Sequence, residues 1–155
     1  MFHPPSDTVN PPVRLLAAFQ QAFPDRSPEW IVRAPGRDVW AAACRARAEQ
    51  FCAANADEDA RAVFTLRSAR LKRTAMQRPL PRWARCPASV LVTLHETEAP
   101  VIGFYFMLVS EEPAGPSQDY GLGLVAAALW HEIHARPYTT DSLIEIVDRA
   151  RRDYL

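Results

Sequence analysis

The chain has 155 residues, of which 48% are hydrophobic, and its 18 Lys and Arg residues balance 18 Asp and Glu residues. A chain of this length can form one domain with a full core, and the neutral balance gives no argument for a nucleic-acid partner. The N-terminal sequence lacks the pattern of a signal peptide, and no apolar run approaches the ~18 residues of a membrane span.

The N-terminal part of the sequence predicts a tail followed by a helix. We expect residues 1–10 to form a flexible tail and residues 11–155 to form a single domain. A helix is predicted from about residue 12 to residue 23, because apolar residues there share helical spacing. These residues are Val13, Leu16, Phe19 and Phe23.

Strands are predicted next. Residues 30–32 form a short apolar run before Pro35-Gly36, which is a turn signal. Residues 38–54 are ambiguous, because their alanine content favours a helix while the preceding turn and the aromatic residues favour strands. The alternating pattern at residues 61–66 predicts a further strand.

In the C-terminal half, apolar spacing predicts helices at residues 83–96 and 120–135. Residues 101–109 are apolar on both faces, which predicts a central strand covered on both sides. Residues 112–120 are expected to be a loop. A last helix, capped by Thr139 or Thr140, places its apolar residues on one face. Helices and strands are mixed without a βαβ rhythm, which indicates an α+β fold.

Four segments resemble the galactokinases in family order. Residues 15–37 are similar to the family's opening helix and the strand that ends in A-P-G-R, and residues 83–94 to its helix beginning W-x-x-Y-x-x-G-V. Residues 103–113 resemble the strand that leads into the phosphate loop, and residues 148–155 (DRARRDYL) resemble Q-R-A-E-N-E-Y-V. The galactokinases are GHMP kinases. The resemblance implies a reduced GHMP-kinase N-terminal domain, with a mixed sheet packed with helices (ribosomal protein S5 domain 2-like), and it favours strands at residues 39–54.

The sequence departs from the family where sugar is bound. After A-P-G-R the family continues V-N-L-I-G-E-H-T-D-Y-N, whereas here Arg37 is followed by Asp38-Val39-Trp40-Ala41. The acidic and histidine sugar ligands are missing with that stretch. The family's catalytic aspartate lies beyond position 155, so we assign no catalytic residue.

The phosphate loop is degenerate as well. The family reads P-x-G-x-G-L-S-S-S, and its serines are replaced here by Asp119, Tyr120 and Gly121. Asp119 puts a negative charge where a phosphate would bind. The family's metal-binding glutamate falls at Val125, which cannot bind Mg²⁺. The degenerate loop, which we expect to hold no cofactor and no metal, comprises Pro113, Gly115, Ser117, Asp119 and Gly121.

Other motifs leave alternatives open. His131 and His134 are similar to a zinc motif, but their i, i+3 spacing favours a polar helix surface. Residues 61–85 hold eight Lys and Arg residues and no acidic residue, which favours either a solvated edge or an anion- or partner-binding surface. That surface would comprise Arg67, Arg70, Lys72 and Arg73. Gly121 and Gly123 predict a close approach of a helix to a strand.

The leading hypothesis is a non-catalytic galactokinase-like domain (pseudokinase) that acts as a binding or assembly protein. The alternative is one half of a split ATP-dependent sugar kinase completed by a second polypeptide. We expect a homo-oligomer, or a protein partner that covers the missing C-terminal lobe, with Trp130, Ile133 and Ile146 at the interface. Three cysteines without metal-type spacing indicate reduced thiols, so we expect a cytoplasmic protein with no membrane partner.

Overall fold

A five-stranded mixed sheet forms the centre of the computed structural model, which describes residues 11–97 and 102–155. The strand order is β1-β2-β5-β3-β4. β5 pairs parallel with β3, and all other neighbours are antiparallel. The strands are β1 (Trp30–Arg33), β2 (Val39–Arg45), β3 (Phe51–Asn55), β4 (Ala60–Phe64) and β5 (Phe104–Ser110). The predicted tail at residues 1–10 lies outside the described residues.

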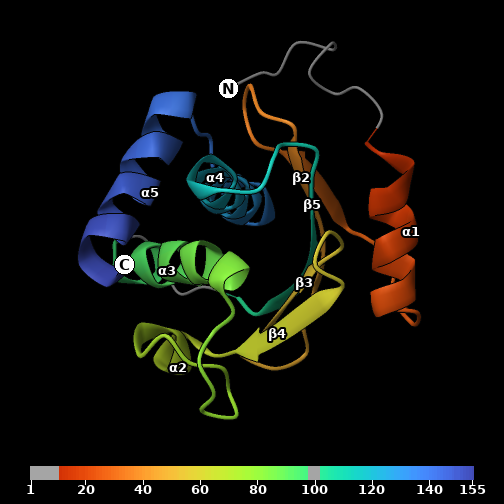
Figure 1. Cartoon of the computed structure of the whole chain (residues 1–155), viewed down its shortest axis with the longest axis horizontal. Helices are drawn as coiled ribbons and strands as arrows, with labels where there is room; N and C mark the ends of the chain where they lie inside the picture. Colours follow the sequence, from red (N-terminus) through yellow and green to blue (C-terminus); the bar gives the residue numbers. More distant parts are fainter. Residues whose placement is uncertain (1–10, 98–101) are drawn as a thin grey trace.

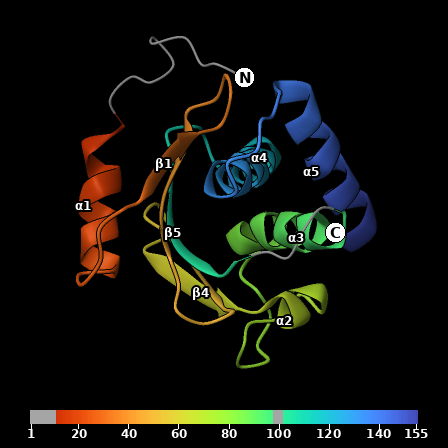
Figure 2. The same cartoon turned by 180° about the vertical axis from the view of Figure 1, so that it is seen from behind.

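Helices cover both faces of the sheet. One face carries a single helix, α1, and the other faces α3 and α4, with α5 packed on the outside of these two (Figures 1 and 2). The helices are α1 (Val13–Ala22), α2 (Leu66–Arg70), α3 (Arg82–Thr97), α4 (Pro116–Ile133) and α5 (Thr140–Tyr154). The predicted α+β class and the mixed sheet packed with helices are therefore confirmed.

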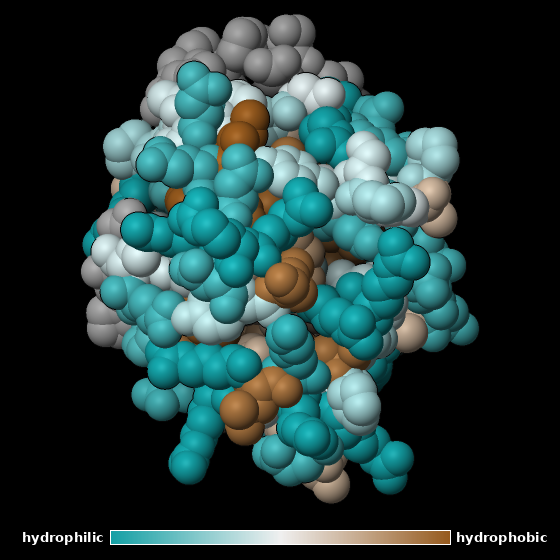
Figure 3. Space-filling model, turned by 60° about the vertical axis from the view of Figure 1, so that its left-hand side comes forward, coloured by the Kyte–Doolittle hydropathy of each residue, from teal (hydrophilic) through white to brown (hydrophobic). Residues whose placement is uncertain are grey.

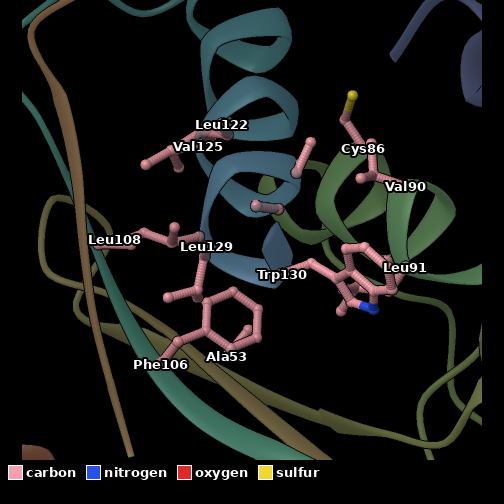
Figure 4. Packing of buried hydrophobic residues seen from close by; sticks show 14 of the residues in the cluster. Ala53, Cys86, Val90, Leu91, Phe106, Leu108, Leu122, Val125, Leu129 and Trp130 are labelled. Atoms are coloured by element: carbon pink, nitrogen blue, oxygen red, sulfur yellow. The ribbon is translucent and has the colours of Figure 1, made fainter. Parts of the chain in front are cut away.

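Two apolar cores result from this arrangement. The larger lies between the sheet and the three-helix layer, where Leu129 of α4 points toward Phe106 of β5 (Figure 4). The smaller lies beneath α1 and includes Phe19, Trp40 and Met107. Because β5 faces both cores, its expected burial on both sides is confirmed.

Two strands joined by a short turn, rather than a helix, occupy residues 39–54, as the resemblance implied. In β2, Ala41 and Ala43 face the larger core while Ala42 faces the smaller one. β3 repeats the pattern, with Ala53 and Ala54 on opposite faces. Small side chains on both faces let helices lie close to the sheet, so the alanines serve packing here and their helix propensity is overridden.

Four local predictions need correction. The buried residues of α1 are Leu15 and Phe19, while the side chains of Val13 and Leu16 are exposed. The predicted strand at 61–66 ends at Phe64, because Thr65 and Ser68 form a capping box that starts α2.

Residues 116–120 are helical rather than a loop, since α4 begins at Pro116. The predicted strand at 101–109 begins at Phe104, and its first residue lies outside the described part.

The remaining helices follow the prediction. Thr139 caps α5, whose buried side chains include Leu143, Val147 and Ala150. The three cysteines are free and buried. Among the helices in the described ranges, none combines the length and the apolar character needed to cross a bilayer.

Candidate functional site

A hollow of about 440 Å³ lies where β5 leads into α4, at the predicted phosphate loop. Its wall consists of one residue from the β1–β2 turn and a continuous stretch of the β5–α4 connection. The lining residues are Arg37, Glu112, Pro113, Ala114, Gly115, Pro116 and Ser117. The structure therefore brings the A-P-G-R motif to the degenerate phosphate loop, although the two are far apart in the sequence.

A bidentate ion pair between Arg37 and Glu112 lies on one side of this hollow. Arg37 Nε donates to Glu112 Oε2 at 2.8 Å, and Arg37 Nη2 donates to Glu112 Oε1 at 2.7 Å. The two side chains are only 23% and 20% exposed, so the pair is partly shielded from solvent. Hydrogen bonding from Arg37 holds the pKa of Glu112 below its usual value, and a hydrogen bond from the Asp38 backbone N–H acts in the same direction.

Further hydrogen bonds fix the loop around this pair. Arg37 Nη2 also donates to the Ser117 carbonyl at 2.7 Å, and Gln118 Nε2 donates to the Glu112 carbonyl at 3.0 Å. Gly115 has φ of 144° in open space, a conformation that side chains other than hydrogen rarely allow. The loop is thus held by the chain's own side chains, with a glycine at its strained position.

Three residues of the loop offer no backbone N–H to an anion. A phosphate cradle directs backbone N–H groups at its ligand, but Pro113 and Pro116 have none. The N–H of Asp119 already donates to the Gly115 carbonyl at 3.0 Å. Within residues 113–119, this leaves the N–H groups of Ala114, Gly115, Ser117 and Gln118.

Asp119, which was predicted to lie in a loop, lies in the first turn of α4. There the helix dipole favours its own carboxylate. Its charge is not isolated, because Arg82 Nε lies 3.0 Å from Asp119 Oδ2. The sequence predicted that a lone Asp119 carboxylate would repel phosphate. In the structure this carboxylate is already paired with Arg82, so an ion pair of the chain itself occupies the position.

The two glycines of α4 permit close approaches of different kinds. A Cβ at Gly121 would lie 3.0 Å from Arg37 Nη2 and 3.0 Å from Val39 Cγ2, so here α4 does approach the sheet closely. A Cβ at Gly123 would lie 2.5 Å from Cys86 Sγ, on α3. The prediction of a helix–strand contact is correct at Gly121 and wrong at Gly123, which contacts helices.

The histidines do not form a polar surface together. His131 is buried, and its Nδ1 lies 2.7 Å from the Ala127 carbonyl oxygen. His134 is half-buried, and its Nδ1 lies 2.8 Å from the Trp130 carbonyl oxygen. Val125, at the place of the family's metal ligand, is buried in the core. Across residues 11–97 and 102–155, no group of three His, Cys, Asp or Glu residues could hold a metal ion.

Trp130 cannot line an exposed interface. It is fully buried, points toward α3 near Leu91 (Figure 4), and its ring stacks on His134 with centroids 4.3 Å apart. The prediction that Trp130 lies at an interface is wrong because residues 121–131 of α4 are buried on every side. Helical spacing therefore does not identify an exposed face in this stretch. Ile133 and Ile146 are half-buried at the margin of the core.

The predicted anion surface divides into paired and unpaired residues. Arg70 Nη2 lies 3.4 Å from Glu96 Oε2. Arg67, Lys72 and Arg73 are exposed and have no carboxylate within 4.0 Å in the described part of the chain.

Three solved structures share this architecture. Galactokinase from Lactococcus lactis complexed with galactose matches 91% of this chain and 42% of its own, with a TM-score of 0.69 and 11% sequence identity. Mevalonate kinase from Methanococcus jannaschii matches 74% of this chain and 36% of its own, with a TM-score of 0.58 and 8% identity. A second mevalonate kinase matches 74% and 37%, with a TM-score of 0.57 and 9% identity.

At such low identities the likeness concerns the fold. No protein-family model and no curated protein sequence matches the chain. The chain spans 36 to 42% of the length of the solved structures described above. This chain therefore has the fold of the N-terminal domain of the GHMP kinases, as its sequence resemblance to the galactokinases implied.

Proposed function

We propose that this chain is a non-catalytic, galactokinase-like domain (a pseudokinase) that acts as a binding or assembly protein. The observation that carries the proposal is the Arg37–Glu112 ion pair, which lines the phosphate-loop hollow with two of the chain's own opposite charges already bound to each other. In a nucleotide site the arginine would have to remain available for phosphate.

The electrostatics of the hollow support this reading. Two cations near the loop, Arg37 and Arg82, are paired with Glu112 and Asp119. A triphosphate carries several negative charges and would have to displace these carboxylates or bind beside them. Displacing Glu112 is costly because its pair with Arg37 is largely shielded from solvent, and binding beside Asp119 places like charges close together.

The hollow also lacks side chains that phosphoryl transfer would require. Transfer requires positioned phosphate and metal at the same place. Val125 is buried and has no ligand atom, and the loop hydroxyls of the family are replaced by Asp119, Tyr120 and Gly121. The donor set of this hollow therefore suits its present internal contacts better than MgATP.

Calorimetric titration with MgATP tests the proposal. We expect no heat of binding up to millimolar nucleotide. A dissociation constant below about 100 μM, equivalent to roughly 5.5 kcal/mol, would contradict the proposal and favour the alternative of a split sugar kinase.

A variant of the same loop serves as the matched control. Glu112→Gln combined with Asp119→Ser leaves Arg37 and Arg82 without their carboxylates and restores a loop hydroxyl. If the two carboxylates block the hollow, this variant should bind MgATP more tightly than the parent protein. Its melting curve must remain cooperative for the comparison to count.

A further inference from the structure

A second surface of the molecule lies away from the phosphate-loop hollow. α2 and the chain that follows it, up to the start of α3, form the lower end of the molecule in Figure 1. We define residues 66–81 as the basic loop. Its sequence is LRSARLKRTAMQRPLP.

Internal hydrogen bonds give the basic loop a defined shape. Arg73 and Pro79 form an isolated β-bridge, and Thr74 N donates to the Arg78 carbonyl at 2.7 Å. Ala75 N donates to the Val63 carbonyl at 2.8 Å, which ties the tip to the edge strand β4. The side chains at the tip are thus presented by an ordered backbone.

Most cations of the basic loop have no carboxylate partner among the described residues. Residues 61–85 contain no acidic residue, and only Arg70 within the loop has a described carboxylate within 4.0 Å. The cations without one are Arg67, Lys72, Arg73 and Arg78, and all four are exposed.

Two large apolar side chains share this loop with the cations. Leu71 is 64% exposed and Met76 is 81% exposed. Single exposed apolar residues are common on proteins. Here, however, both lie within a positively charged, ordered loop, and Leu71 directly precedes Lys72.

We propose that the basic loop docks on an anionic lipid bilayer. Leu71 and Met76 enter the interfacial region, and the unpaired cations contact lipid phosphates. This is the combination of apolar insertion and positive charge that holds peripheral proteins on anionic membranes. The expectation of no membrane partner came from the lack of a spanning segment, and surface docking requires none.

The composition of the loop favours lipid over nucleic acid. Proteins that bind single strands stack bases on aromatic side chains, and residues 66–81 contain no aromatic residue. Phosphate contacts on a duplex would use the cations but give Leu71 and Met76 no role. A bilayer uses both kinds of side chain.

Vesicle cosedimentation tests the proposal on the full chain. We expect binding to phosphatidylcholine vesicles that contain about a third phosphatidylserine, and none to phosphatidylcholine alone, at about 0.1 M salt. Lys72→Ser with Arg73→Ser should weaken binding about thirtyfold. Leu71→Ser with Met76→Ser should weaken it about tenfold.

Matched pairs on other elements control for charge and hydrophobicity. Arg47→Ser with Arg149→Ser removes the same charge, and Val13→Ser with Ile31→Ser removes exposed apolar side chains. Both control pairs should retain binding. All four double variants change exposed residues, and their melting curves report whether each remains folded.

Three results would overturn the proposal. The first is that the parent protein does not bind the anionic vesicles. The second is that the control pairs weaken binding as much as the loop pairs. The third is tight binding of single-stranded RNA that depends on Lys72 and Arg73 but not on Leu71 and Met76, which would assign the loop to nucleic acid. None of these results depends on whether MgATP binds.

Discussion

At the residue scale, the pairing of Arg37 with Glu112 follows from strand register. β2 and β5 pair antiparallel with Val39 opposite Ser110. Continuing that register two residues beyond the strand ends places Arg37 opposite Glu112. The sequence marked Arg37 through the A-P-G-R motif, but its partner 75 positions away could not be identified before the strand neighbours were known.

We expect the Arg37–Glu112 pair to make stability depend on pH. The pKa of Glu112 is lowered in the folded state from its ordinary value of 4.5 by hydrogen bonding from Arg37, so the unfolded chain binds the proton more tightly. The stabilisation is therefore complete above about pH 4.5 and is lost as the pH falls through the lower folded value. At neutral pH, Arg37→Met should lower the free energy of unfolding by about 1–3 kcal/mol.

Urea unfolding between pH 6 and pH 3 measures this dependence. Glu112→Gln should give a flatter curve of stability against pH than the parent protein. Glu111→Gln is the control, because this neighbouring side chain is 47% exposed and surface pairs contribute little. Parallel curves for the parent protein and Glu112→Gln would show that the pair does not act as described.

At the element scale, the sequence predicted most elements but not all of their faces or ends. Strand β2 was predicted through the resemblance, because its alanines alone favour a helix. α2 was missed since it is only five residues long, too short for a periodic signal. The early start of α4 had a readable signal, because Pro116 stands at the first helical position after a glycine.

The burial of Trp130 had a signal too. Residues 121–130 of α4 contain no charged or polar side chain, and a helix that is apolar all round is a buried one. Helical spacing predicts an outer face for this stretch, but its composition indicates that it has none. The partners of Asp119 and Gly123, by contrast, lie on α3 and depend on how the helices cross.

Gly123 is predicted to be required for the contact between α4 and α3. Alanine usually stabilises a helix by about 1 kcal/mol relative to glycine. At this position a Cβ would lie 2.5 Å from Cys86 Sγ and 3.3 Å from Val147 Cγ1. Gly123→Ala should therefore lower stability, by about 1–3 kcal/mol for overpacking of this kind.

A double-mutant cycle separates the two effects. Cys86→Ala removes the nearest clashing atom, so Gly123→Ala should cost less in that background than in the parent protein. Thermal or urea unfolding of the four proteins gives the coupling free energy. A coupling energy near zero would mean that the sulfur atom is not the obstacle.

At the scale of the whole molecule, charge is distributed unevenly although the total is zero. Residues 61–85 hold eight of the 18 cations and no acidic residue, so the rest of the chain carries ten cations and 18 acidic residues. One edge strand of the sheet, β4, lies beside this basic segment and is tied to it through Ala75. The zero net charge of the whole chain therefore gives no sign of the basic segment at residues 61–85.

Self-association is a further expectation at this scale. Ile133 of α4 and Ile146 of α5 lie half-buried at the margin of the core. On the face that carries α5, small apolar areas are separated by hydrophilic residues (Figure 3). A contact of limited apolar area gives weak binding, so we expect a two-fold dimer that forms at micromolar concentration.

Light scattering across a dilution series measures this equilibrium. The mass should rise toward twice the 17.4 kDa of one chain with increasing concentration. Ile146→Glu should hold the mass at that of one chain and lower the melting temperature modestly, because this half-buried side chain loses core contacts. Leu16→Glu, on the exposed side of α1, should leave the association unchanged. Trp130→Glu is not a probe of the interface: a charge at this fully buried position should unfold the domain, at a cost of about 3–5 kcal/mol. A mass of 17.4 kDa at every concentration would rule out self-association.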